Sequence, residues 1–142
     1  MRCVVLDVMK IKTLISWIGV ADINASKGVQ QSGLGPIGQA ITAFSFDRLV
    51  LLNDFDKKTG SNYANWINKK FESQVSILNE NLSSPTDFGD IYKAASKAIA
   101  NQIDENSESC QLSIHLSPGT PAMAAVWILI TKSQYPEIEL IP

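Results

Sequence analysis

The residues best suited to bind a ligand are Ser117, Gly119 and Thr120, which form a short loop between an apolar strand and an apolar helix. Gly119 has no side chain, so a ligand can approach the backbone closely. Thr120 is a natural N-cap, and Pro121 fits the first helical position because its missing N–H is not needed there. Two hydroxyls and the free amides of a helix start suit a phosphate or ribose oxygen. The alternative interpretation is that Thr120 only caps the helix and Gly119 only makes the turn.

A second candidate loop spans residues 21–35 and contains Asp22, Asn24, Ser26 and Lys27. It is long for a connection between a strand and a helix, and long loops in compact domains are often functional. In a doubly wound parallel sheet, ligands bind at the carboxyl ends of two neighbouring strands whose following connections lead to opposite faces of the sheet. We predict that the two loops meet at that point and form one site.

Two other patterns give weaker indications of chemistry. Gly33, Gly35 and Gly38 match the GxGxxG pattern of dinucleotide-binding domains, with Asp54 as the acidic residue that would approach the adenosine ribose. These glycines begin well beyond the preceding strand, however, and Pro36 lacks an amide donor. His115 could act as a general base, but no serine elbow, acid or second base completes a triad, which argues against serine-type hydrolysis. We interpret His115 as a packed or ligand-contacting residue.

The elements that would position these residues alternate along the chain. Runs of strand length alternate with segments of helical period, which predicts an α/β fold with a Rossmann-like parallel sheet of order 3-2-1-4-5 and helices on both faces. The predicted strands are residues 13–20, 48–53, 75–82, 110–116 and 137–141. The predicted helices are residues 36–44, 62–71, 87–103 and 122–131. The helix that contains Trp127 is apolar nearly all round, as expected of a core or dimer-interface helix.

Composition excludes several classes of function. The net charge of −2 is spread along 142 residues, which argues against binding of duplex DNA by this segment. Charged residues make up only 18% of the chain, which is consistent with an interface between two copies. Cys3 and Cys110 are isolated and His115 is the only histidine, so we expect no metal site and no cofactor. Residues 4–9 are too short for a signal peptide or membrane span, which favours a cytoplasmic location.

Several of these segments together resemble the CRISPR-associated Rossmann fold (CARF) domains. The resemblance is greatest to those at the front of sigma-54-dependent activators of the RNA-repair regulator type. It covers residues 12–142 and leaves residues 1–11 as an unassigned extension. The segments that carry it are residues 14–19 with Asp22, residues 35–37, residues 46–49 and residues 115–123.

The resemblance implies a homodimeric sensor that holds a nucleotide across its two-fold axis, either a cyclic oligoadenylate or a product derived from an RNA end. Closed two-fold symmetry presents every loop twice, so a ring-shaped ligand would gain each contact twice. The sensor would control an effector such as a sigma-54-dependent activator. The ligand-facing positions would be Asp22, Asn24 and Ser26 in the first loop, and Ser117, Gly119, Thr120 and Met123 in the second.

Two alternatives to a sensor stay open at this stage. One is a metal-independent ring nuclease that cleaves a cyclic oligoadenylate, for which Lys27 and Ser117 are the weak catalytic candidates. The second loop has no basic residue, so binding without cleavage is favoured. The other alternative is a dinucleotide-cofactor domain that uses Gly33, Gly35 and Gly38.

Overall fold

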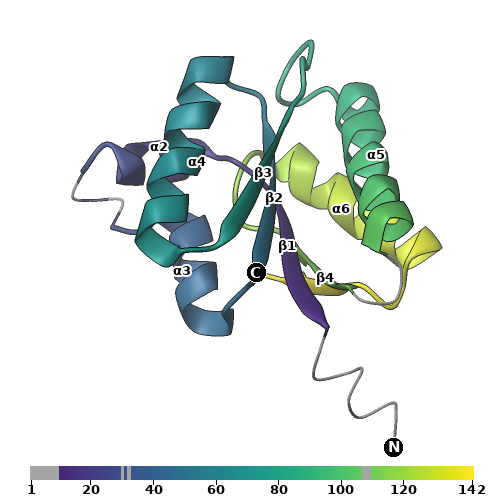
Figure 1. The fold of residues 1–142 in the computed structure, drawn as a ribbon. Helices are drawn as coiled ribbons and strands as arrows, with labels where there is room; N and C mark the ends of the chain where they lie inside the picture. The colour runs from purple at the N-terminus through teal and green to yellow at the C-terminus, as the bar shows by residue number, and fades with distance from the viewer. Residues whose placement is uncertain (1–9, 30, 32, 107–109) are drawn as a thin grey trace, which may run out of the picture.

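The computed structural model describes residues 10–29, 31, 33–106 and 110–142. Its parallel strands form one sheet in the order β3-β2-β1-β4-β5 (Figure 1). The strands are β1 (Ile11–Trp17), β2 (Arg48–Asn53), β3 (Gln74–Asn79), β4 (Cys110–His115) and β5 (Glu139–Ile141). The predicted α/β class and strand order are therefore confirmed. Cys3 and the unassigned extension up to Met9 lie outside the described residues.

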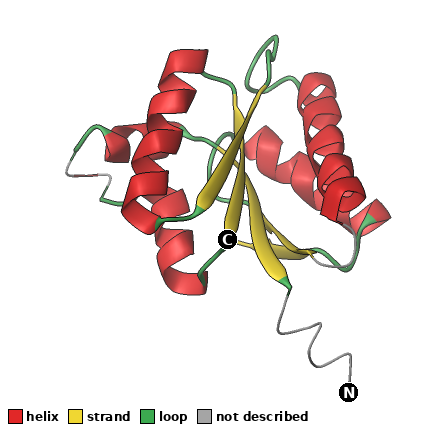
Figure 2. Ribbon diagram, in the orientation of Figure 1, coloured by secondary structure: helices red, strands yellow, loops and turns green. Residues whose placement is uncertain are grey.

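Helices cover both faces of this sheet, as predicted (Figure 2). On one face lie α2 (Val20–Ser26), α3 (Gly35–Phe44) and α4 (Lys57–Phe71). On the other face lie α5 (Phe88–Asn106) and α6 (Pro121–Gln134). Each face has its own apolar cluster, one centred on Ile37 and Tyr63 and the other on Trp17 and Trp127. The sheet thus separates two cores that hold its strand ends in place.

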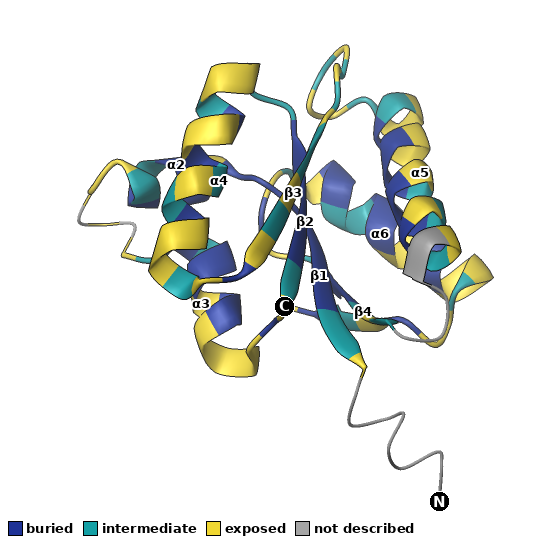
Figure 3. Ribbon diagram, viewed as in Figure 1, coloured by how far each residue is buried: buried dark blue, intermediate teal, exposed yellow. Residues whose placement is uncertain are grey.

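The central strand β1 is buried on both of its sides (Figure 3). It pairs with β2 through Leu14 opposite Leu49, and with β4 through Ile15 opposite Ile114. A strand covered on both faces is expected to be apolar at successive positions, which the run Leu14-Ile15 satisfies. Because β1 and β4 are neighbours, the loops that follow them emerge side by side at the carboxyl edge of the sheet.

The prediction of a loop over residues 21–35 is partly wrong, because Val20–Ser26 forms the helix α2. The strand before it begins at Ile11 and ends at Trp17, instead of spanning residues 13–20. The helix is only 7 residues long and is held by a side-chain cap: Asp22 Oδ2 accepts a hydrogen bond from the amide of Gly19, the N-cap residue. Capping of this kind satisfies an otherwise free amide at the helix start.

The start of α4 also differs from the prediction, which began this helix at Asn62. The helix begins at Lys57, because Asp56 caps it by accepting from the amide and the hydroxyl of Thr59. Its first turns contain Gly60 and little apolar sequence, so periodicity alone does not reveal them. The connection between β2 and α4 is therefore short, residues 54–56, and lies at the carboxyl end of β2.

Candidate functional site at the carboxyl edge of the sheet

A pocket of about 390 Å³ opens at the carboxyl ends of β1, β2 and β4. It lies between β1 and β4, where the chain reverses its winding direction, which is the usual ligand position in open α/β sheets. This volume is within the range of small-molecule sites. The lining residues are Ile18, Gly19, Val20, Ala21, Asp22, Pro36, Asp54, Phe55, Pro85, Ser117, Pro118, Gly119, Thr120 and Met123.

Gly19 and Gly119 form the place where the two predicted loops meet. A Cβ added to Gly19 would lie 2.8 Å from the amide nitrogen of Gly119, closer than real Cβ atoms approach. Gly119 has a φ of +89°, which favours glycine, and a Cβ on it would lie 2.5 Å from the Met123 sulfur. The backbones of the two loops are therefore packed together with no room for a side chain between them.

The buried Asp22 side chain stabilises the wall of the pocket that the first predicted loop forms. Its Oδ2 accepts from the Gly19 amide at 2.9 Å, and its Oδ1 accepts from the Ile37 amide at 2.9 Å. One carboxylate thus caps the starts of both α2 and α3. Gly35 packs directly on it: with a φ of +73°, an added Cβ would lie 3.1 Å from Asp22 Cα. Burial raises the pKa of Asp22 to about 6, although the two amides that donate to it act in the opposite direction.

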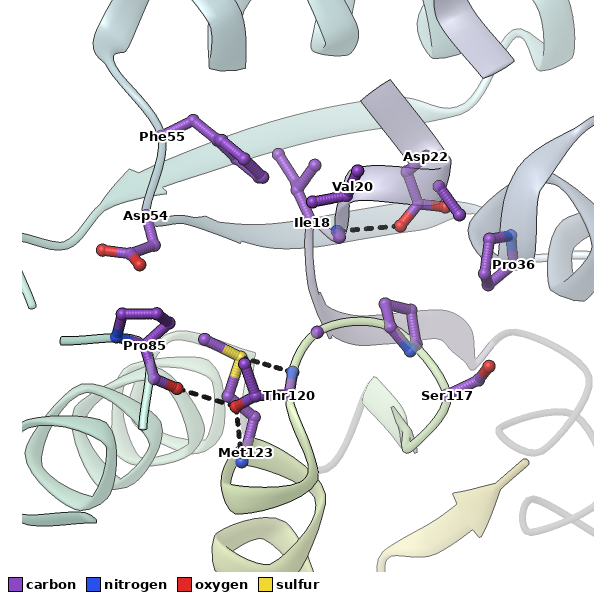
Figure 4. Close-up of a pocket in the computed structure, with 14 residues that line it drawn as sticks. Ile18, Val20, Asp22, Pro36, Asp54, Phe55, Pro85, Ser117, Thr120 and Met123 are labelled. Atoms are coloured by element: carbon purple, nitrogen blue, oxygen red, sulfur yellow. Dashed lines mark hydrogen bonds between the residues drawn. The ribbon is translucent and has the colours of Figure 1, made fainter. Parts of the chain in front are cut away.

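Thr120 stabilises a second wall of the pocket, which the loop before α6 forms. Its hydroxyl oxygen accepts from the Met123 amide at 3.3 Å and so caps α6, as predicted. The same hydroxyl donates to the Pro85 carbonyl at 2.7 Å, and the Thr120 amide contacts the Met123 sulfur at 3.4 Å. Thr120 therefore joins the start of α6 to the loop before α5, as the dashed lines in Figure 4 show.

Asp54, Phe55 and Pro85 form a third wall that the predicted loops did not include. Figure 4 shows these residues on one side of the pocket and Pro36 and Ser117 on the other. The Asn53 side chain fixes the β2–α4 loop by donating to the Phe55 and Asp56 carbonyls and accepting from the Phe55 amide. Burial raises the pKa of Asp54, opposed by the Leu82 amide. The position of Asp54 directly after the strand β2 was the sequence signal for this wall.

The predicted ligand-facing residues divide into two groups. Asp22, Ser117, Gly119, Thr120 and Met123 line the pocket, although the Asp22 side chain is itself fully buried. Asn24, Ser26 and Lys27 do not line it. Ser26 and Lys27 border a separate hollow near the start of α4, together with Asp56 and Lys58. The reason is that α2 carries them away from the sheet edge as it winds.

The pocket is mostly apolar, and no Lys, Arg or His is found among the described residues that line it. Its polar groups are the hydroxyls of Ser117 and Thr120, the backbone at the glycine loops and the Asp54 carboxylate. Such a site can stack flat apolar groups. At the start of α6 it can offer an oxygen the Ala122 amide, since Pro121 has no N–H and the Thr120, Met123 and Ala124 amides already have partners. Its described lining residues therefore include no side-chain cation that could neutralise several phosphates.

The remaining candidates lie outside this pocket. His115 is buried beside Ser16, with 3.4 Å between its Nδ1 and the Ser16 hydroxyl, and burial lowers its pKa to about 4. Of the GxGxxG glycines, Gly35 packs on Asp22, and a Cβ on Gly38 would meet the Leu34 side chain. Within the described residues, no group of three or more His, Cys, Asp or Glu side chains could hold a metal ion. None of the described helices is long and apolar enough to cross a membrane.

The fold is shared with a solved structure of Enterococcus italicus Csm6 bound to cyclic hexa-2′-fluoro-hexa-dAMP. The TM-score is 0.74 at 16% sequence identity, and the match covers 92% of this chain and 32% of the Csm6 chain. This chain therefore corresponds to about a third of that protein's length. At this identity the match shows the fold alone, and it confirms the Rossmann-like fold predicted from the sequence. No family model matches the sequence, and no curated protein sequence does either.

Proposed function

We propose that this chain is a nucleotide-sensing domain that binds a cyclic oligoadenylate or an RNA-end product in the pocket at the carboxyl edge of its sheet. The observation that carries the proposal is the contact of the Gly19 and Gly119 loops over a pocket at the switch point. The match to Csm6, whose structure contains a cyclic oligoadenylate analogue, supports the class of ligand. Identity of 16% is too low to carry ligand identity by itself.

The chemistry of the pocket suits a nucleotide that brings few negative charges into it. Phe55, Pro85 and Pro36 offer flat apolar surface for bases, and aromatic stacking is tolerant of base identity. The start of α6 offers the Ala122 amide, and a helix-start amide can receive an anionic oxygen without a lysine or arginine. A phosphodiester, which carries one charge, fits this site better than a triphosphate would.

We propose that two copies form a homodimer and bind the ligand jointly. The helix α6 buries Val126, Trp127 and Ile130 in the core but leaves Ile128 and Leu129 exposed at 40% and 62%. Neighbouring exposed apolar side chains on a helix suit a subunit interface. Two pockets in a two-fold dimer would then contact a ring-shaped ligand from both halves. A shift between the subunits on binding would control an attached effector, such as a sigma-54-dependent transcription activator.

Binding without cleavage is the better-supported activity. Metal-independent cleavage needs a group that stabilises developing charge at the phosphate, and a cation is the usual one. Lys27 was the candidate, and it borders a different hollow from Ser117. Ser117 alone offers a hydroxyl with no base beside it among the described pocket residues.

Calorimetry with cyclic tetra- and hexaadenylate, linear oligoadenylates and RNA ending in a cyclic phosphate tests the proposal. We expect one class of ligand to bind, and Gly119→Ala to weaken its binding about tenfold or more because the new methyl group meets Met123. Gly28→Ala is the matched control: Gly28 also has a positive φ, of +81°, but lies in open space outside the pocket. Absence of binding to the whole panel by a folded protein would contradict the proposal.

A further inference from the structure

The most unusual group near the pocket is the buried carboxylate of Asp22. Its side chain is 0% exposed and lies where α2, α3 and the β1–α2 connection meet. Two backbone amides donate to it, and within the described part of the chain no charged side chain contributes to its pKa. An ionised carboxylate in such a place is stabilised by hydrogen bonds alone, so its charge is sensitive to any further negative charge nearby.

The titratable groups around Asp22 do not neutralise it. From α4, the Tyr63 hydroxyl is fully buried with no hydrogen-bond partner among the described residues, and its pKa is raised by burial and by the charge of Asp22. From α3 the neighbour is the Ile37 amide, and from the loop before α6 it is the backbone of Gly119. Lys27, at the end of α2, borders the separate hollow. On the opposite wall of the pocket, Asp54 adds a second carboxylate.

Asp22 is also close to the surface that a ligand would touch. A Cβ on Gly19 would lie 3.4 Å from Asp22 Oδ2 and 2.8 Å from the Gly119 amide nitrogen. The buried carboxylate and the backbone of the second loop are therefore separated by little more than the backbone of Gly19. An anion bound against these glycines would lie within a few ångströms of a buried negative charge, with little water between them to screen it.

We propose that Asp22 is the positioning residue of the pocket and takes up one proton from solvent when the pocket receives an anionic ligand. The inference rests on the proposed function. The step is simple: the carboxylate and a solvent proton become a carboxylic acid, and no other bond changes. Protonation removes the repulsion between two negative charges, while the acid still accepts a hydrogen bond through its carbonyl oxygen. Affinity for the anion then rises as the pH falls toward 6.

The test is calorimetry of wild-type protein with cyclic hexaadenylate, in pairs of buffers that differ in ionisation enthalpy. All phosphates of this ligand are diesters, so it has no group that titrates between pH 6 and 8. We expect net proton uptake on binding, and an affinity that increases by about threefold or more from pH 8 to pH 6.5. Asp22→Asn should bind with no proton uptake and with a pH-independent affinity. A purely structural role for Asp22 would not produce this change in pH profile.

Asp54→Asn is the matched control, because Asp54 is the other pocket carboxylate whose pKa burial raises. Proton uptake should persist in this variant even if its affinity changes. If Asp22→Asn does not fold, the 13Cγ signal of Asp22 can be titrated by NMR in the wild type, and its pKa should rise when ligand is added.

Each outcome decides between the two proposals. If cyclic hexaadenylate and the other nucleotides fail to bind, the proposed function is wrong and this inference falls with it. If cyclic hexaadenylate or another diester ligand binds without proton uptake, only the inference is overturned. Uptake that persists in Asp22→Asn, or disappears in Asp54→Asn, also overturns it, because the proton would then reside on another group.

Discussion

Gly19 and Gly119 pack against each other across the carboxyl edge of the sheet, so closely that a Cβ on Gly19 would stand 2.8 Å from the Gly119 amide nitrogen. This contact joins two loops that are far apart in the sequence and follow adjacent strands. Both sides of it are backbone, so neither side can yield by a rotamer change. The shape of the pocket therefore depends on the absence of a side chain at position 19.

Gly19→Ala should separate the two loops and weaken nucleotide binding. Overpacking at a rigid contact costs about 1–3 kcal/mol, so we expect a comparable loss of stability and at least a tenfold loss of affinity. Gly89→Ala is the control, because Gly89 lies within α5 and its added Cβ would meet only Asp87 at an ordinary 3.4 Å. Denaturation and calorimetry on both variants make the comparison. Unchanged affinity in Gly19→Ala would show that the contact does not shape the site.

His115 should make a pH-dependent contribution to the stability of the folded chain. Burial lowers its pKa to about 4 in the folded chain, from 6.5 in the unfolded one. The unfolded chain thus binds the proton more tightly, so the contribution present above pH 6.5 is lost as the pH falls toward 4. The loss is of the order of 3 kcal/mol by linkage. His115→Gln should remove it, and urea denaturation between pH 4.5 and 7.5 measures the difference. Parallel curves for both proteins would contradict this prediction.

Asp22 should have the opposite effect over an overlapping pH range. Its pKa is about 6 in the folded chain and 3.8 in the unfolded one, so the folded chain binds the proton more tightly. The resulting stabilisation is fully present below pH 3.8 and is lost as the pH rises through 6, with a size of the order of 3 kcal/mol. Asp22→Asn should therefore lose stability more steeply than the wild type as the pH falls from 7 to 4.5. In the wild type the two effects should largely cancel.

Thr120→Val should weaken the start of α6 and its link to Pro85. The N-cap hydrogen bond to Met123 and the bond to the Pro85 carbonyl are both lost, and loss of an N-cap costs about 1 kcal/mol. Thr42→Val is the control, since its hydroxyl donates to the Gly38 carbonyl within α3 and links no separate segments. We expect chemical denaturation to show the larger loss for Thr120. Equal losses would mean that the Pro85 contact contributes nothing.

The order of the sheet could be predicted because its evidence is local. The runs at β1 and β4 are apolar over strand length, and right-handed crossovers leave few arrangements of alternating strands and helices. The helix α2 could not be predicted in the same way. Its sequence, from Val20 to Ser26, has no marked helical period, and the contacts that stabilise it come from Asp22 to Gly19 and Ile37. Ile37 lies in another helix, so this stabilisation depends on tertiary structure.

The residues that line the pocket could also be predicted only in part. Ser117 and Thr120 follow a recognisable strand and begin a recognisable helix, so their place at the sheet edge follows from topology. Asn24 and Lys27 were expected near them because residues 21–35 were predicted to form one long loop. A short helix changes the direction of each side chain, and these residues leave the site. The Thr120 hydroxyl links Pro85 to this site by a hydrogen bond, and no sequence pattern predicts that contact.

Leu129→Lys should dissociate the proposed homodimer without unfolding the chain. Leu129 is 62% exposed on α6, so a charged side chain there is tolerated in a monomer but would be buried without a partner in an interface. Phe44→Lys is the control, because Phe44 is 46% exposed on α3, which covers the opposite face of the sheet. Light scattering should give a dimer for the wild type and for Phe44→Lys, and a monomer for Leu129→Lys. The monomer should also bind cyclic oligoadenylate more weakly, because each pocket would then contact only half of the ring. A dimer that survives Leu129→Lys would require an interface elsewhere on the molecule.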